Sequence, residues 1–209
     1  MHDSNNEKKG VGKRIVVAIT GASGAIYAKR LLECLTGNGA DVHLVISPYG
    51  RRLFLDELAI EEPSAENLVE PSLAKAITVY PYRDVGARLA SGSFLTDGMI
   101  ICPCSSNTLG EVAAGLGGNL ISRAAAVHLK EGRKLILVPR EMPISQIEIE
   151  NMLRISKSGG ILCPASPGFY MLPESVDDLA DFVVGKLCDL VGVPHQLNTR
   201  WAPESAPEP

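Results

Sequence analysis

Short apolar runs alternate along this chain with segments whose apolar residues recur at helical spacing. The first run, Ile15 to Ile19, is rich in β-branched residues, as expected for a strand that is buried on both faces. A glycine turn at 21–24 follows, and the apolar positions from Ala28 to Leu35 then repeat along one helix face. A strand, a glycine turn and a helix in this order are typical of the opening unit of an open α/β sheet.

The same alternation predicts six strands and an α/β fold with a mostly parallel sheet. After the first strand, the expected strands span residues 41–46, 76–80, 98–102, 134–138 and 160–163. The first helix is expected to end near Gly37, and further helices are expected over about 48–58, 120–131, 145–157 and 175–191. Ser145 with Glu148, and Ser175 with Asp178, are predicted to form capping boxes at the starts of the last two helices.

The chain has 209 residues, which is enough for one domain with a sizeable core, and we place that domain at residues 13–194. Residues 1–12 are polar and are expected to be disordered, whereas residues 195–209 form a polar, proline-rich tail. Residues 59–75 carry several acids and two prolines, and we expect a surface connection there.

Composition and charge narrow the choice of partners. The net charge is −4, so no overall basic field points to nucleic acid. No apolar run is long enough to cross a bilayer, and the polar N-terminus is unlike a signal peptide, so no membrane partner is expected. The five cysteines, an odd number without a signal peptide, indicate the reduced thiols of a cytoplasmic protein.

The glycine turn at 21–24 predicts a phosphate site. Backbone N–H groups and the helix dipole favour an anion at a helix N-terminus, and two glycines with a small hydroxyl residue leave space for it. A dinucleotide site would need G-x-G-x-x-G and an acid at the end of the second strand, but this turn is G-x-x-G and that strand ends at Ser47. The pattern therefore favours a mononucleotide over NAD. The alternative is a tight turn that only connects two elements.

Two further strand ends carry unusual polar residues. A polar loop is expected at Ser105 to Thr108 after one buried strand, and another at Arg140-Glu141 after the next. Because the carboxyl ends of parallel strands lie along one edge of a sheet, we expect these residues and the glycine turn to converge on one pocket. Cys102 and Cys104 could suggest a metal, but no partners stand at ligand spacing, and we expect small residues closing a buried strand and no metal.

Five segments in order resemble the UbiX-type flavin prenyltransferases. They are TGASGA at 20–25, ASGS at 90–93, CPCS at 102–105, PREMP at 139–143 and PGFY at 167–170, within a match over roughly residues 13–201. The resemblance implies a Rossmann-like or flavodoxin-like three-layer α/β sandwich that assembles into a homo-oligomer, a dodecamer. It implies transfer of a dimethylallyl group from dimethylallyl monophosphate to N5 and C6 of reduced FMN. The prenylated FMN then serves UbiD-type decarboxylases.

The resemblance also implies roles for individual residues. For FMN it implies Gly21, Ala22, Ser23, Ser47, Ser105, Ser106, Asn107, Thr108 and Arg140. For the prenyl phosphate it implies Tyr170 and Lys186, and it places Ser91, Arg123, Lys130, Arg140 and Trp201 among the substrate-binding positions. Its catalytic positions are Ser23, Glu57, Lys130 and Glu141.

The residue types suit this chemistry. Breaking an allylic C–O bond leaves negative charge on phosphate, which Lys130, Arg140 and Lys186 could stabilise. Glu57 or Glu141 could move a proton, and the aromatic face of Tyr170 or Trp201 could stabilise an allylic cation.

Each of these residues also has an ordinary structural interpretation. Arg123 and Lys130, seven residues apart, share a helix face that could be a solvated basic stripe. Glu57 could be helix surface, Tyr170 part of the core and Trp201 an anchor for the tail.

Three other functions compete with this interpretation. FMN-dependent cysteine decarboxylases share the first glycine turn, but their P-x-M-N-x-x-M-W segment and catalytic His are absent. A non-catalytic flavin-binding protein would not need so many cations, and an NAD-dependent oxidoreductase would need an acid after the second strand.

Residues 177–181 read D-D-x-x-D, the magnesium motif of prenyl-diphosphate synthases, and we interpret them as a capped helix start.

Overall fold

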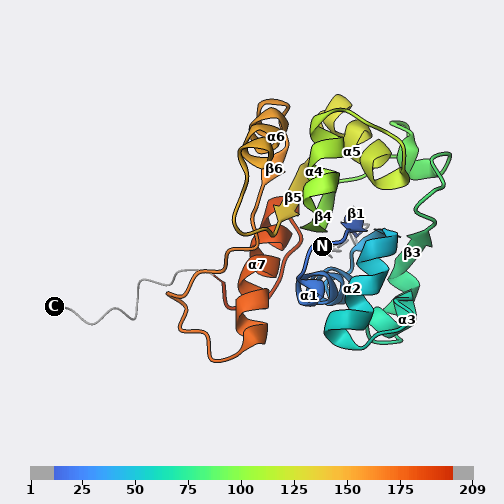
Figure 1. Ribbon diagram of the computed structural model, residues 1–209. Helices are drawn as coiled ribbons and strands as arrows, with labels where there is room; N and C mark the ends of the chain where they lie inside the picture. The colour runs from blue at the N-terminus through green and yellow to red at the C-terminus, as the bar shows by residue number, and fades with distance from the viewer. Residues whose placement is uncertain (1–11, 200–209) are drawn as a thin grey trace, which may run out of the picture.

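A parallel sheet of six strands, in the order β3-β2-β1-β4-β5-β6, forms the centre of residues 12–199, the part of the chain that this computed structural model describes (Figure 1). The strands are β1 (Arg14–Ile19), β2 (Asp41–Ile46), β3 (Ile77–Tyr80), β4 (Gly98–Cys104), β5 (Leu135–Pro139) and β6 (Ile161–Leu162). The α-helices are α1 (Ala25–Gly37), α2 (Pro48–Leu58), α3 (Ala65–Leu68), α4 (Ser106–Ala113), α5 (Leu120–Lys130), α6 (Gln146–Lys157) and α7 (Val176–Val191). Two short 3-10 helices, η1 (Ala74–Ala76) and η2 (Arg88–Ala90), complete the described elements.

The helices cover both faces of the sheet, so the predicted three-layer α/β sandwich is confirmed. Alternate residues of β1 divide the core. Ile15, Val17 and Ile19 pack with α1, α2, α3 and α7, whereas Val16 and Ala18 pack with α4, α5 and α6. Figure 1 shows these two groups of helices on opposite sides of the strands. Burial on both faces explains why the strands read as nearly continuous apolar runs.

Two segments differ from the sequence-based expectation. The expected surface connection at 59–75 contains α3, whose Leu68 is fully buried in the same core cluster as the apolar residues of α1. The polar residues expected to form a loop after β4 instead open a helix, α4, with Ser105 as its N-cap. Both helices are short and carry few apolar residues, so their periodicity is weak and burial against neighbouring elements decides their structure.

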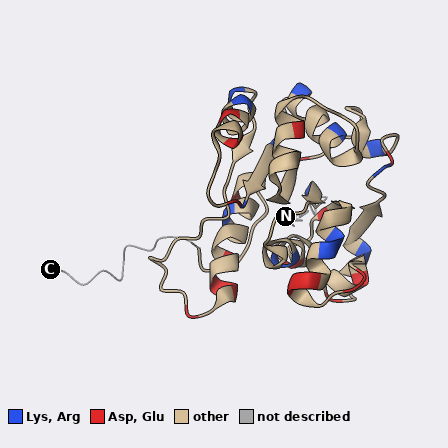
Figure 2. Cartoon of the chain, viewed as in Figure 1, with Lys and Arg blue, Asp and Glu red and all other residues tan. Residues whose placement is uncertain are grey.

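Charged residues lie mainly on the helices of both outer layers, and the strands carry few of them (Figure 2). Among the described helices, none combines the length and the apolar character that spanning a bilayer requires. The expected disorder of residues 1–12 and most of the expected tail fall in residues 1–11 and 200–209, which lie outside the described part. Trp201 is among them.

Candidate active site

Thr20 directly follows β1 and forms hydrogen bonds with residues at the end of β4. These two neighbouring strands are the point from which the chain order runs in opposite directions across the sheet. Consecutive strands run outward from β1 to β2 and β3, and from β4 to β5 and β6, so the β1–β4 boundary is the topological switch point where such sheets bind ligands. The Thr20 hydroxyl donates to the carbonyl of Pro103 at 2.9 Å and accepts the backbone N–H of Ser105 at 2.8 Å. Thr20 is buried, and it fixes the loop after β1 against the loop after β4. Sequence reasoning did not select it, because a threonine beside a glycine turn carries no separate signal.

The glycine turn approaches the start of α2 very closely. A Cβ atom at Gly21 would lie 2.5 Å from Cβ of Tyr49, so a larger residue there would force the turn and α2 apart. The N-terminus of α1 already holds an anion from the chain itself. The Glu57 carboxylate accepts the backbone N–H groups of Gly24 at 2.9 Å and Ala25 at 2.8 Å. The turn is therefore more than a connection, but these two donors are not available to a phosphate.

Two more helices begin at the same edge of the sheet, each capped by a serine. The Ser47 hydroxyl accepts the N–H of Gly50 at 3.0 Å at the start of α2, and the Ser105 hydroxyl accepts the N–H of Thr108 at 3.4 Å at the start of α4. The positive ends of α2 and α4 thus point toward the edge that carries Gly21. Ser106, Asn107 and Thr108 form the first turn of α4, so the residues implied for FMN lie on or beside helix N-termini.

The loop after β5 closes this edge on the other side. The Arg140 guanidinium donates to the carbonyl of Ser23 at 2.9 Å, which joins the PREMP segment to the glycine turn. Ser106 Oγ lies 3.5 Å from a carboxylate oxygen of Glu141. The three strand-end loops therefore lie next to one another, and their convergence on one shared pocket stays a prediction.

Glu148 connects α4 with α6. Its carboxylate accepts the Ser145 backbone N–H at 2.9 Å in the predicted capping box, and it also accepts the Ser106 hydroxyl. The hydroxyl hydrogen bond is the main reason why the pKa of Glu148 lies below its ordinary value. The sequence predicted only the capping box, because the second contact depends on the packing of α6 against α4.

A small pocket opens beside Arg140 and Glu141. Its volume is about 220 Å³, and its lining combines these two charged residues with the apolar side chains of Met142, Ile144 and Met152. A lining that combines charged and apolar side chains is what a small phosphorylated hydrocarbon would require.

Tyr170 and Lys186 lie on the loop after β6 and on α7. The Tyr170 ring contacts the Phe182 ring edge-on, with centroids 5.6 Å apart, and Lys186 follows Phe182 by one helical turn on the same side of α7. Burial raises the pKa of the Cys163 thiol, and the charge of Lys186 offsets part of that shift, which places Lys186 near the end of β6. The structure thus brings the two residues implied for the prenyl phosphate to one side of α7.

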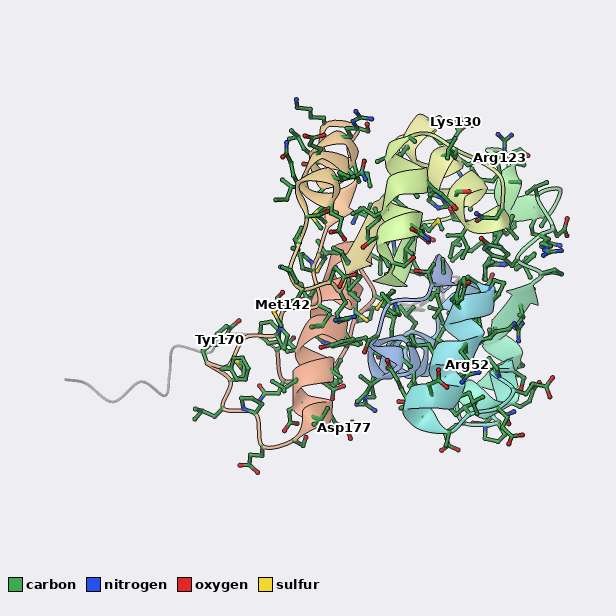
Figure 3. All side chains as sticks on the ribbon, in the orientation of Figure 1. Arg52, Arg123, Lys130, Met142, Tyr170 and Asp177 are labelled. Carbon is green, nitrogen blue, oxygen red and sulfur yellow. The ribbon has the colours of Figure 1, made fainter. Side chains whose placement is uncertain are left out.

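The other cationic candidates lie elsewhere. Lys130 ends α5, shortly before β5 begins at Leu135, and therefore lies at the amino-terminal edge of the sheet. Its ammonium contacts Glu131 at 2.6 Å, beside the turn that contains Ser91. Figure 3 shows Arg123 and Lys130 on the side of the molecule away from Tyr170. A single chain does not bring Ser91, Arg123 and Lys130 to the convergent loops, whereas Trp201 lies outside the described residues.

The D-D-x-x-D segment at the start of α7 has structural partners. The Asp178 carboxylate accepts the N–H groups of Glu174 and Ser175, and Asp181 forms a two-bond ion pair with Arg30 at 2.8 Å. Across residues 12–199, no group of three or more His, Cys, Asp or Glu side chains is arranged to hold a metal ion.

The cysteines that close β4 are also part of the core. Cys102 and Cys104 are fully buried, which raises the pKa of both thiols well above the ordinary range. A raised pKa keeps them as neutral thiols, as expected for small residues at the end of a buried strand.

The fold and the convergent loops define a flavodoxin-like α/β protein with helix N-termini gathered at its switch point. The profile of the Flavoprotein family matches residues 3–188. The flavin prenyltransferase UbiX of Halalkalibacterium halodurans is 47% identical over 191 residues, which cover 90% of this chain and 93% of that protein. The chain therefore belongs to the UbiX flavin prenyltransferase family, and the resemblance inferred from the five segments is confirmed.

Two solved structures support the same conclusion. AnUbiX (PadA1), in complex with FMN and dimethylallyl pyrophosphate, matches with a TM-score of 0.83 and 39% identity, over 91% of this chain and 97% of that chain. A dodecameric FMN-dependent UbiX-like decarboxylase from Escherichia coli O157:H7 matches with a TM-score of 0.81 and 40% identity, over 90% of this chain and 99% of that chain.

Proposed function

We propose that this protein joins a dimethylallyl group, supplied as dimethylallyl monophosphate, to N5 and C6 of reduced FMN. The observation that carries the proposal is the convergence of the loops after β1, β4 and β5, tied together by the hydrogen bond from Arg140 to the carbonyl of Ser23. The relative with FMN and dimethylallyl pyrophosphate shares this fold at 39% identity. Reduced FMN would supply the nucleophilic positions, and the product would serve a UbiD-type decarboxylase.

The strand-end residues fit the flavin mononucleotide. The N-termini of α2 and α4, with their caps Ser47 and Ser105, offer backbone donors to one phosphate, and Arg140 supplies a positive charge. Gly21 lets the glycine turn lie close against the start of α2, because a side chain at Gly21 would meet Tyr49. Ser106, Asn107 and Thr108 add polar groups on the first turn of α4.

The prenyl donor would lie between this edge and α7. Lys186 and Arg140 would stabilise the departing phosphate, and Tyr170 would bind it with its hydroxyl. Met142, Ile144 and Met152 line the nearby pocket with apolar side chains, which suits a five-carbon chain.

We assign proton transfer to Glu57 and Glu141, with Ser23 as a further catalytic residue in the glycine turn, where its backbone carbonyl accepts a hydrogen bond from Arg140. The Glu141 side chain lines the 220 Å³ pocket, where it could take the proton that leaves flavin C6. The Glu57 carboxylate is held at the N-terminus of α1, where it could take up a proton and pass it to a phosphate oxygen.

We further propose a homo-oligomer, a dodecamer like the relative from Escherichia coli O157:H7, in which copies share sites. Ser91, Arg123 and Lys130 of one copy would complete the site of another, because they lie far from the convergent loops of their own chain. Large apolar side chains beside those loops are exposed, among them Met142, which is 86% exposed, and such surfaces favour association.

The alternative of an FMN-dependent cysteine decarboxylase finds little support in the histidines. His43 bonds Tyr80 at 2.8 Å, and His128 bonds Thr96 at 2.8 Å, both beside the core. His195 packs against Gly185 of α7. The three histidines within residues 12–199 are therefore engaged away from the glycine turn.

The deciding experiment is anaerobic incubation with reduced FMN and dimethylallyl monophosphate, followed by mass spectrometry of the extracted flavin. We expect a flavin whose mass has increased by one dimethylallyl group, and little of it with the diphosphate. Unmodified FMN from protein that binds FMN would refute the transferase and leave a flavin-binding protein. Release of carbon dioxide from a peptidyl cysteine would support the decarboxylase instead.

A mixing experiment tests the shared site. Lys130→Ala and Glu141→Gln should each be nearly inactive alone, and subunit exchange between them should restore part of the activity because some sites then receive both native residues. Absence of any recovery in a demonstrably mixed oligomer would contradict the arrangement.

A further inference from the structure

Cys34 of α1 and Cys188 of α7 lie side by side although 154 residues separate them in sequence. Their sulfur atoms are 3.5 Å apart, and the Cys188 thiol donates a hydrogen bond to the Cys34 sulfur. The two helices are also joined by the ion pair between Arg30 and Asp181, which lies on the N-terminal side of the sulfur contact along both helices. No step of the proposed prenyl transfer uses this pair.

The two thiols differ in access. A pocket of about 300 Å³ is lined by Cys34 and its neighbours Arg30, Glu33 and Asn38, whereas Cys188 is fully buried behind it. Within the described part of the chain, Cys102 and Cys104 are buried in β4 and are less accessible to a reagent than Cys34. Cys34 is therefore the member of the pair that a small reagent from solution would meet first.

The two thiols also differ in acidity. The hydrogen bond from Cys188 is the main reason why the pKa of Cys34 is lowered, whereas the same contact and burial raise the pKa of Cys188. A thiolate is the form that attacks a disulfide, so Cys34 suits the role of the attacking group. The adjacent Cys188 then suits the role of the resolving thiol.

We propose that Cys34 and Cys188 form a reversible dithiol–disulfide pair that links α1 covalently to α7, with a low-molecular-weight disulfide such as oxidised glutathione as the oxidant. The Cys34 thiolate attacks one sulfur of the oxidant, forms a mixed disulfide and releases the first small thiol. Cys188 loses its proton, attacks the Cys34 sulfur and releases the second small thiol. Two protein thiols are oxidised, one small disulfide is reduced, and their two protons end on the two released thiols.

The link would fix the helix that carries Lys186 to the helix that follows the glycine turn. Cys188 faces α1, whereas Lys186 is exposed, so the disulfide would not consume the cation. A bond between residues so far apart in sequence removes much of the freedom of the unfolded chain, and the oxidised protein should unfold at a higher temperature than the reduced protein. This inference does not depend on the prenyl transfer.

The experiment uses the full chain, first reduced and then treated with oxidised glutathione. Free thiols are alkylated in denaturant after an acid quench, and the digest is analysed by mass spectrometry with and without reductant. We expect three of the five cysteines to be alkylated, a Cys34–Cys188 peptide that reductant separates, and a melting temperature raised by several degrees. Five alkylated cysteines, a stable glutathione adduct on Cys34, or a link between other cysteines would each overturn the proposal.

Matched variants make the assignment specific. Cys34→Ser and Cys188→Ser should each abolish the linked peptide and the rise in melting temperature. Cys163→Ser should keep both, because Cys163 lies at the end of β6 and is not part of the pair. Loss of the link in Cys163→Ser would contradict the assignment, and the peptide map of the native protein tests it even where a variant fails to fold.

Discussion

Replacing Thr20 by valine should loosen the connection between the loops that follow β1 and β4. Valine keeps the shape of threonine but removes the hydroxyl that donates to Pro103 at 2.9 Å and accepts the N–H of Ser105 at 2.8 Å. The Pro103 carbonyl keeps a second partner, the backbone N–H of Thr20 at 3.2 Å, whereas the N–H of Ser105 loses its partner. The change therefore leaves one backbone donor unsatisfied at the switch point.

The expected loss follows from that one donor. An unsatisfied buried donor costs about 1–3 kcal/mol, and we expect a decrease of about 2 kcal/mol in the free energy of unfolding. For a chain of this size this corresponds to a decrease of roughly 4–8 °C in melting temperature. Because Ser105 caps α4 and belongs to the proposed FMN site, the affinity for FMN should fall as well.

The assay is thermal unfolding at one fixed protein concentration, with and without FMN, because assembly and ligand both shift the transition. Thr20→Ser is the matched control, since it keeps both hydrogen bonds and loses one buried methyl group, worth about 1 kcal/mol. Valine should therefore be more harmful than serine. If Thr20→Val melts like the native protein, or if Thr20→Ser is the less stable variant, the hydroxyl does not hold the two loops together.

Three further predictions address catalysis, metals and pH. Glu141→Gln should bind FMN normally but slow turnover by at least about tenfold, as expected when a proton-transfer group is lost; a native rate across the pH range in single-turnover kinetics would make Glu141 structural. Activity should persist in excess EDTA and in Asp177→Asn, and activity that is lost and then restored by magnesium would show that the acidic cluster holds a metal. Burial lowers the pKa of His128 below its ordinary 6.5, so folding favours the neutral ring, and stability should fall as the pH decreases below 6.5. A flatter decrease in the melting temperature of His128→Gln between about pH 7 and pH 5 would confirm this, and an unchanged slope would exclude His128 as the cause.

Sequence reasoning succeeded where one short segment carries the whole signal. The run from Ile15 to Ile19 is apolar at every position, which fits a central strand, and both predicted capping boxes are present. It failed at α4, because SNTLGEVA mixes polar and apolar residues without a clear period, and the segment is helical through its contacts with α5 and α6. The second contact of Glu148, with Ser106, was hidden for the same reason.

The sequence by itself determined the alternation of strands and helices, the membership of the family and the residues that stand at each strand end. Those features depend on local periodicity, turn chemistry and motif order, and each of these signals can be recognised in short stretches of sequence. Only the tertiary structure decided the strand order, the hydrogen bond from the Ser105 N–H to the Thr20 hydroxyl, and the position of Lys130 at the opposite edge of the sheet. It also decided that Cys34 meets Cys188 across 154 residues. Such contacts depend on how whole layers pack, because long-range neighbours are set by the burial of every apolar face together and not by any one segment.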